Sequence, residues 1–328
     1  MNNMRIVGAG HALGNKSIHN KCFESILDTS DEWINSRTGI SQRTFSFIDN
    51  TSDLATKAAL AALIDANMTK EEIDCIIVAT MTPDNITPAT APLVQYKLNM
   101  NDQQCLAFDV NGACTGFIYA LQIAASMINA NQVNNVLVIG AETFSKLLDF
   151  SDRSTAILFG DGAGAVILSR CETDDEIIFY TQSKGDVEHQ IYAKGLPLRD
   201  TLANKEQQVG YLEMNGQEVF RFASFAITDA IEKIITKTNI SINDIDLIIP
   251  HQANQRIIKH ASKQLKLPLE RFYTNLNEVG NTSAASIPIA ISQAKQNDLL
   301  KNIRHLLLVG FGAGLTWGAA YISQGGKK

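Results

Sequence analysis

Two stretches of the sequence share one local pattern, and this internal repeat constrains the fold more than any other feature. Residues 68–83 and 240–255 each contain a Thr or Ser able to cap a helix, then Ile-Asp, then an apolar strand-like run. The paired acids, Asp74 and Asp246, are 172 residues apart. Self-similarity at a fixed offset is typical of a duplicated unit.

A second match supports the duplication. Residues 134–143 resemble residues 304–314, and this alignment pairs Gly140 with Gly310 at an offset of 170 residues. Because strand-like and helix-like runs alternate along the chain, each unit is expected to be a mostly parallel α/β structure. The two predicted halves are residues 1–172 and 173–328.

The offset also predicts how the two halves meet. It places Ala284 or Ala285 at the position equivalent to Cys114, and both stretches have small residues at the start of an apolar helix. The halves should therefore bring equivalent helix starts together. From about 174 to 211 the repeat is interrupted by polar sequence with Gly and Pro, which predicts a surface excursion.

The composition excludes several functional classes. A net charge of −6 gives no general attraction to nucleic acid or to an anionic membrane, although a local basic patch remains possible. No apolar run approaches membrane-spanning length, and the first residues lack the apolar core of a signal peptide. Five cysteines without CxxC spacing suggest free thiols in the cytoplasm, and the six histidines form no HxxxH pair, so no metal is expected.

Cys114 lies in a cluster of small residues, where an apolar strand-like run gives way to a helical pattern. The N–H groups and dipole of a helix start can lower a thiol pKa and favour the nucleophilic thiolate. Gly112 and Gly116 would let backbone and substrate approach closely. The alternative is a buried small hydrophobe, the usual role of a free cysteine. Cys75 and Cys105 lie in apolar runs and are interpreted as structural.

Three later stretches offer partners for a nucleophile. His251 follows a buried strand, where α/β proteins present functional side chains, although a lone histidine is often structural. Asn281 opens the repeated helix and could equally be a simple N-cap. The glycine loop 309–318 could supply N–H groups to an oxyanion hole. This loop and residues 159–165 also hint weakly at phosphate binding, but neither has the dinucleotide fingerprint.

Several motifs in one order make the chain similar to a known family. Residues 109–117 (DVNGACTGF), 250–257 (PHQANQRI), 280–288 (GNTSAASIP) and 310–318 (GFGAGLTWG), together with 28–40 and 152–165, resemble β-ketoacyl-acyl-carrier-protein synthase III. The resemblance runs from about residue 6 to residue 322. It implies a thiolase-like fold, in which two duplicated α/β halves form a five-layer αβαβα sandwich.

The resemblance implies a decarboxylative Claisen condensation that initiates fatty-acid synthesis. Cys114 would be acylated by a short acyl-CoA, with the backbone N–H groups of Cys114 and Ala313 holding the oxyanion. Malonyl-acyl carrier protein would then lose carbon dioxide while His251 and Asn281 donate hydrogen bonds to the enolate. His251 should therefore carry its proton on Nε2. The product would be a 3-ketoacyl-acyl carrier protein, and Asn281 at the third position points to the initiating type of synthase.

The resemblance also implies where the CoA thioester, a substrate rather than a cofactor, is bound. Trp33 and Arg37 are four residues apart in a short helix expected to be capped near Thr29 or Ser30 and to stop at Gly39. An indole and a guanidinium on one face can hold adenine by stacking. The full implied set for CoA and pantetheine is Trp33, Arg37, Arg153, Gly216, Phe220 and Asn254.

A basic stripe suggests where the acidic carrier protein docks. Arg256, Lys259, Lys263 and Lys266 are spaced 3, 4 and 3, which puts them on one helical face next to His251. A solvated charged face is the simpler alternative. The resemblance implies a homodimer without nucleic-acid or membrane partners. The predicted docking set is Gln252, Ala253, Asn254, Gln255, Arg256, Lys259, Lys263 and Arg221.

The primer and the pathway stay open at this point. Thr87 stands where some relatives place a Phe that walls the acyl pocket, so a longer or branched primer is expected. The excursion near 190–210 would also admit a paralogue from a specialised pathway. A Cys-dependent acyltransferase or thioesterase is the main alternative, because a Cys-His-Asn set also serves hydrolysis. A nucleotide-binding module without catalysis is a distant third.

Overall fold

Two main β-sheets organise the computed structural model, which describes residues 3–186, 188–196 and 210–324. The strand order is β1-β7-β6-β4-β5 in the first sheet and β8-β13-β12-β11 in the second. The first sheet consists of β1 (Met4–Leu13), β4 (Cys75–Ala79), β5 (Leu106–Val110), β6 (Asn135–Thr143) and β7 (Asp161–Arg170). The second consists of β8 (Glu176–Ser183), β11 (Leu247–Pro250), β12 (His305–Gly312) and β13 (Thr316–Ser323).

The two sheets have the same topology, as the repeat predicts, but both are mixed, and the expectation of mostly parallel sheets is wrong. In the first, β4 is parallel to β6, while β7 is antiparallel to both β6 and β1. In the second, β11 is parallel to β12, while β13 is antiparallel to both β12 and β8. A parallel bridge between Ile248 and Phe272 occupies the place that β5 takes beside β4. The chain passes from one sheet to the other between Arg170 and Glu176.

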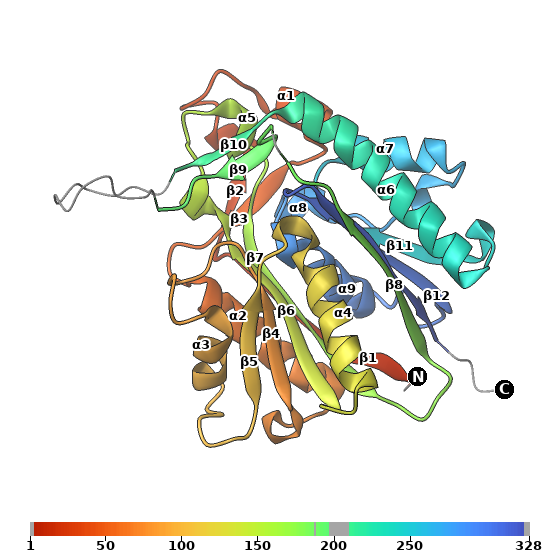
Figure 1. Cartoon of the computed structure of the whole chain (residues 1–328). Helices are drawn as coiled ribbons and strands as arrows, with labels where there is room; N and C mark the ends of the chain where they lie inside the picture. The colour runs from red at the N-terminus through yellow and green to blue at the C-terminus, as the bar shows by residue number, and fades with distance from the viewer. Residues whose placement is uncertain (1–2, 187, 197–209, 325–328) are drawn as a thin grey trace.

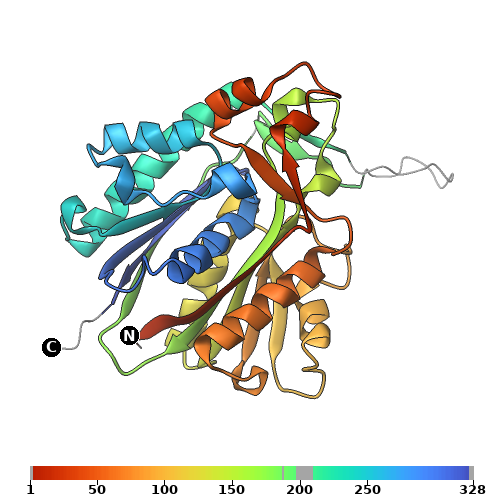
Figure 2. The same ribbon diagram turned by 180° about the vertical axis from the view of Figure 1, so that it is seen from behind.

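Helices cover the outer faces of both sheets and fill the space between them, which gives five layers (Figure 1). Figure 2, the view from behind, shows the blue helix α9 between the two sheets. This arrangement confirms the predicted αβαβα sandwich. The outer helices are α2 (Thr51–Ala66) and α3 (Thr90–Lys97) on the first sheet, and α6 (Gly216–Thr238) and α7 (Gln255–Gln264) on the second; the central pair is α4 (Gly116–Asn129) and α9 (Ser286–Gln296).

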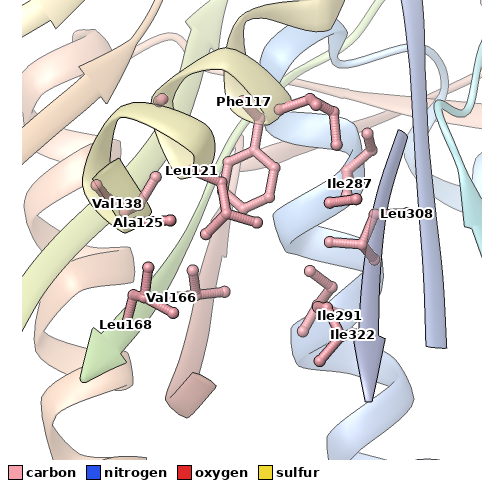
Figure 3. Close-up of a cluster of buried hydrophobic side chains, with 14 of the residues drawn as sticks. Phe117, Leu121, Ala125, Val138, Val166, Leu168, Ile287, Ile291, Leu308 and Ile322 are labelled. Carbon is pink, nitrogen blue, oxygen red and sulfur yellow. The ribbon is translucent and has the colours of Figure 1, made fainter. Parts of the chain in front are cut away.

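The central layer is the core that the two halves share. Phe117 and Leu121 of α4 pack with Ile287 and Ile291 of α9, between side chains of both sheets (Figure 3). Alternate residues of a strand face opposite layers: Val138 of β6 lies in this central cluster, while its neighbours lie in the cluster under α2 and α3. Burial on both faces explains why these strands read as continuous apolar runs.

The repeated Ile-Asp motif fixes equivalent corners of the two halves. Asp74 Oδ2 accepts hydrogen bonds from the backbone N–H groups of Asn134 and Asn135, at 2.7 and 2.9 Å. Asp246 Oδ2 makes the same pair of contacts with residues 304 and 305, at 2.8 and 2.9 Å. The helix expected before each motif is only a single 3-10 turn closed by a capping box, at η2 (Lys70–Glu72) and η5 (Ile242–Asp244).

The two helix starts meet across the molecular centre. Each is preceded by a short 3-10 turn, η3 (Ala113–Thr115) before α4 and η7 (Ser283–Ala285) before α9. Ala113 and Ser283 have positive φ values of 46° and 50°, so the turns are equivalent in conformation as well as in position. A Cβ built on Gly140 would lie 2.2 Å from the carbonyl oxygen of Ala284, and one on Gly310 would lie 3.3 Å from Cα of Thr115. Glycine in β6 and β12 thus admits the other half's turn.

The remaining elements are short, and the predicted surface excursion needs a correction. The stretch 174–211 is not a continuous surface excursion, because residues 176–183 form the edge strand β8 and β9 pairs with β10. Residue 187 and residues 197–209 lie outside the described part of the chain. The smaller elements are β2 (Lys16–His19), β3 (Gln42–Phe45), β9 (Ile191–Ala193), β10 (Leu212–Met214), α1 (Asp31–Thr38), α5 (Arg153–Ala156), α8 (Leu276–Val279), η1 (Asn20–Cys22), η4 (Phe144–Leu147) and η6 (Leu269–Arg271).

Over the described residues, no helix combines the length and the apolar character needed to cross a bilayer.

The contact at Gly140 gives a stability prediction. Gly140→Ala should lower the free energy of unfolding by about 2 kcal/mol, since the added methyl overlaps the backbone of η7 in a packed core. Gly185→Ala is the matched control, because a Cβ there meets no atom within 4 Å. Urea denaturation of both variants measures the difference. Equal stability of the two variants would contradict close packing of β6 against the opposite helix start.

Candidate active site

A cavity of about 350 Å³ lies where the two halves meet, and residues of both halves line it. Cys114 comes from η3, His251 follows β11 directly, and Asn281 stands between α8 and η7. The structure therefore brings together the three predicted catalytic residues, which are far apart in the sequence. The rest of the lining is largely apolar, and it includes Phe311 and Leu315.

The last glycine loop packs directly against Cys114. A Cβ built on Gly312 would lie 2.9 Å from Cβ of Cys114 and 3.0 Å from its backbone nitrogen, so only glycine permits this approach. Ala313, the next residue, lines the cavity with Cys114. The two residues proposed to supply oxyanion N–H groups therefore border the same space.

Cys114 is 7% exposed, and its Sγ lies 3.4 Å from Oγ of Ser283. Burial raises the pKa of the Cys114 thiol to about 12, while the hydrogen bond with Ser283 opposes that shift. The expectation that a helix start lowers this pKa is wrong for the ligand-free chain. The residue precedes α4 in the turn η3, and desolvation of the thiolate outweighs the helix terminus. The resting thiol is protonated at neutral pH.

His251 is buried and neutral. Burial lowers its pKa to about 3, and Phe311 packs edge-on against the ring. Nδ1 lies 2.7 Å from the hydroxyl oxygen of Ser286, which also accepts the backbone N–H of Gln252 at 3.5 Å. The Ser286 hydroxyl can donate its own proton to Nδ1. The ring then carries its proton on Nε2, the tautomer that the resemblance implies.

Asn281 is held in a fixed orientation. Its Oδ1 accepts the backbone N–H of Ser283 at 2.9 Å, and its main chain bonds Leu158 and Gly160. The simple N-cap predicted for Asn281 is wrong, because the N-caps of η7 and α9 are Thr282 and Ala285. The contact with Ser283 instead closes a turn just before η7. It also engages the acceptor atom and leaves the Nδ2 group to donate toward the cavity. Asn111 makes the equivalent contact in the first half, to the N–H of Ala113 at 3.2 Å.

The predicted CoA residues form two neighbouring groups. Gly216, Phe220 and Asn254 line the cavity itself. Asn254 caps α7 through the N–H of Arg256, and its Nδ2 donates to the carbonyl of Arg37 at 3.2 Å, which ties α1 to α7. The interpretation of α1 is confirmed, with Ser30 as N-cap and Gly39, at φ 81°, as C-cap.

The second group lies on α1 and α5. Trp33 is partly exposed, and the guanidinium carbons of Arg153 and Arg37 lie 4.7 and 5.9 Å from its ring centroid. Arg153 also donates to the carbonyl oxygen of Asp28. Arg153 thus lies over the Trp33 ring, where the resemblance places the adenine.

The docking surface needs two corrections. Gln252 is 0% exposed and donates to the carbonyls of Pro250 and Tyr273, so it cannot contact a partner. Lys266 follows the end of α7 and has a φ of 55°, so it is not on the helical face. The exposed cations that remain on α7 are Arg256, Lys259 and Lys263. Gln255 and Ala253 are half-buried, and Arg221 pairs with Glu218 at 3.0 Å.

Arg256 reaches the cavity from this helix. Its guanidinium lies 5.7 Å from the ring centroid of Phe220, and both residues line the cavity. Thr87 is exposed and is not among the residues that line the cavity of its own chain.

Three residues of the site were missed from the sequence. Ser283 and Ser286 lie in a motif that was noted for Asn281, and the repeat already placed this motif opposite Cys114. Glu142 is the last residue but one of the buried strand β6, in a stretch that was used only to establish the repeat. A carboxylate at the end of an otherwise apolar run was the available signal.

The comparisons with known proteins all point to one family of enzymes. The family model described as 3-oxoacyl-(acyl-carrier-protein (ACP)) synthase III matches residues 108–186, and its C-terminal counterpart matches residues 235–323. Beta-ketoacyl-(acyl-carrier-protein) synthase III of Clostridium perfringens is 48% identical over 98% of this chain and 99% of its own length. The Clostridium acetobutylicum protein of that name is 44% identical over 97% and 98%. The crystal structure of 3-oxoacyl-(acyl-carrier-protein) synthase III from Aquifex aeolicus has a TM-score of 0.89 at 40% identity, covering 98% of this chain and all of that chain.

The raised thiol pKa predicts how Cys114 reacts with an alkylating agent. In the ligand-free chain the rate should rise about tenfold per pH unit from pH 7 to 9, because the thiolate fraction grows in that ratio below a pKa of about 12. Peptide mapping after iodoacetamide measures this rate, with exposed Cys22 as the internal control for reagent and time. A plateau below pH 8 would show that Cys114 is already ionised at rest.

Proposed function

The chain belongs to the β-ketoacyl-acyl-carrier-protein synthase III family, and on that premise we propose that Cys114, His251 and Asn281 divide two half-reactions between them. As a member, the chain is an acyl-transferring condensing enzyme that initiates fatty-acid synthesis. In the first half-reaction, Cys114 Sγ attacks the carbonyl carbon of an acyl-CoA and CoA leaves. The N–H groups of Cys114 and Ala313 stabilise the oxyanion.

The second half-reaction forms the carbon–carbon bond. The thioester carbonyl of malonyl-acyl carrier protein accepts hydrogen bonds from Nε2 of His251 and Nδ2 of Asn281. Carbon dioxide leaves, and the two donors stabilise the enolate that forms. The enolate carbon attacks the acyl group on Cys114, which releases the thiolate and a 3-ketoacyl-acyl carrier protein. A neutral His251 suits this role, because it donates a hydrogen bond to the enolate without transferring a proton to it.

One observation supports this assignment over a thiol hydrolase. In a Cys-His-Asn hydrolase the asparagine orients the histidine. Here the side chain of Asn281 bonds Ser283, and Nδ1 of His251 bonds Ser286. Each of the two side chains is therefore held by its own serine, and each keeps an N–H group that can donate to one shared carbonyl oxygen. Two donors beside a nucleophile fit condensation better than hydrolysis.

The carrier protein should dock on α7. Lys259 and Lys263 are exposed on the helix that begins beside His251, and Arg256 extends this charge to the cavity. An acidic carrier would be attracted to this local surface even though the whole enzyme is negatively charged.

A second copy of the chain should cover the edge of the first sheet. β5 is one of the two edge strands of this sheet, its apolar Leu106 is 52% exposed, and Ile86 beside Thr87 is 80% exposed. Unpaired edge strands invite pairing, and a two-fold dimer through β5 would cover both residues. Thr87 would then face the partner's acyl pocket, where its small size leaves room for a longer or branched primer. The five free cysteines fit a cytoplasmic location.

His251→Ala and Asn281→Ala should separate the half-reactions. Each variant should keep acylation of Cys114 by acetyl-CoA, and each should lose about 10²-fold in malonyl-carrier decarboxylation, the scale of one lost oxyanion donor. Intact-protein mass spectrometry measures acylation, and carbon dioxide release measures decarboxylation. Asn111→Ala, the equivalent amide of the first half, should decarboxylate normally. A histidine or asparagine variant with normal decarboxylation would remove that residue from the enolate site.

Lys263→Glu tests the docking surface. The KM for malonyl-carrier protein should rise about fivefold, because an exposed attraction of up to about 1 kcal/mol is replaced by repulsion. Turnover of malonyl-CoA should not change, and the effect should shrink in high salt as exposed charges are screened. Lys301→Glu, an exposed lysine outside α7, is the matched control. If both substrates respond equally to Lys263→Glu, α7 is not the docking surface.

A further inference from the structure

Glu142 is a buried carboxylate that the two half-reactions do not use. It is 0% exposed at the end of β6, and within the described ranges no lysine, arginine or histidine forms an ion pair with it. Its oxygens instead accept hydrogen bonds from the hydroxyls of Thr80 and Thr82, at 3.2 and 2.5 Å, and from the N–H groups of Met81 and Thr82. Burying a carboxylate without a cation is costly, so a carboxylate at this position is expected to have a function.

Ser283 connects Glu142 to the nucleophile. The thiol of Cys114 donates to Oγ of Ser283 at 3.4 Å, and the Ser283 side chain, from the turn that packs on β6, opposes the burial-driven rise in the pKa of Glu142. Because Oγ accepts from the thiol, Ser283 keeps its own proton to give to the carboxylate. The N–H of Ser283 is fixed on Oδ1 of Asn281, and its φ of 50° is set by the turn η7. Ser283 therefore lies between the thiol of Cys114 and the carboxylate of Glu142.

The protonation behaviour of Glu142 suits a proton acceptor near neutral pH. Burial raises its pKa to about 7, and hydrogen bonds from Thr82, Met81, Thr80 and Ser283 oppose that shift. The groups that face it are the hydroxyls of Thr80 and Thr82 from the loop after β4, the hydroxyl of Ser283 from η7 and, beyond it, the thiol of Cys114 from η3. The thiol and the carboxylate are the titratable members of this set.

Acylation needs such an acceptor because Cys114 is protonated at rest. His251 is not placed for the task by its hydrogen bonds, since its Nδ1 is engaged by Ser286 while Cys114 bonds Ser283. The tautomer proposed for enolate stabilisation also puts a proton, rather than a lone pair, on Nε2. A general base of matched pKa contributes about 10² to 10⁴ to a rate.

We propose that Glu142, acting through Ser283, receives the thiol proton of Cys114 during acylation. This inference deepens the proposed function and rests on it. As the S–C bond to the acyl carbonyl forms, the S–H bond breaks, Ser283 takes that proton and passes its own to Glu142. The carbonyl electron pair moves to oxygen and then returns, which breaks the bond to the CoA sulfur. The proton goes back along the same path to the departing sulfur, so Glu142 ends ionised, as it began.

The test is the rate of Cys114 acylation as a function of pH. Single-turnover acylation by acetyl-CoA is followed by intact-protein mass spectrometry between pH 5.5 and 9. In the unmodified enzyme, the rate should rise with pH and level off above about 7, because only ionised Glu142 accepts a proton. Glu142→Gln should acylate at least about 10² more slowly and should lose this inflection. Ser283→Ala should do the same while leaving the other partners of Glu142 in place.

Two controls separate the relay from a structural role. Malonyl-carrier decarboxylation, which depends on His251 and Asn281, should stay within about threefold of the unmodified rate in Glu142→Gln and Ser283→Ala. Asp161→Asn changes another fully buried carboxylate, one that bonds Ser145 and Ser46, and should leave the acylation inflection unchanged.

The outcomes distinguish the relay from the proposed function. If Glu142→Gln decarboxylates normally and keeps the unmodified pH profile of acylation, the relay is wrong and the function stands. If the substituted carboxylate prevents folding, Ser283→Ala decides by the same profile. If unmodified enzyme never acquires an acyl group on Cys114, the proposed function itself fails.

Discussion

The rest of the site depends on the reciprocal packing of two helix starts. Gly140 of β6 admits the turn before α9, and Gly310 of β12 admits the turn before α4. Each half thus places its short 3-10 turn against the other half's central strand. Because Ala113 and Ser283 adopt the same positive φ, the contact is nearly symmetric. The catalytic cavity lies where this symmetric contact brings Cys114 and Asn281 to one space.

Function arises where the two equivalent halves differ. Cys114 is the counterpart of Ala284, so only one of the two turns carries a nucleophile. Two residues after the paired glycines, Glu142 contacts η7, whereas its counterpart Gly312 packs on Cys114. Glu142 thus gives the site a carboxylate, whereas Gly312 leaves room for the thiol and for the loop with Ala313. A duplicated fold has thereby become one asymmetric site built from both halves.

The repeat and the caps made much of this predictable. The nearly equal offsets predicted that the halves share one topology and that their helix starts meet, and Ser30 and Gly39 marked the ends of α1. What the sequence did not show is burial at single positions. Gln252 and Lys266 flank exposed residues of α7, yet one is fully buried and the other lies beyond the helix. The thiol pKa was misjudged for the same reason, since a helix start is local but desolvation is set by the whole cavity.

Burial makes the charged form of each catalytic group energetically costly. It raises the pKa of Cys114 and of Glu142 and lowers that of His251, so each is driven toward its neutral form. A neutral cavity with N–H donors does not stabilise the uncharged thioester strongly. It stabilises the oxyanion and the enolate, which carry charge only as the reaction proceeds. The exclusion of water that makes Cys114 unreactive at rest also strengthens the hydrogen bonds that stabilise the oxyanion and the enolate, provided that the thiol proton has a place to go.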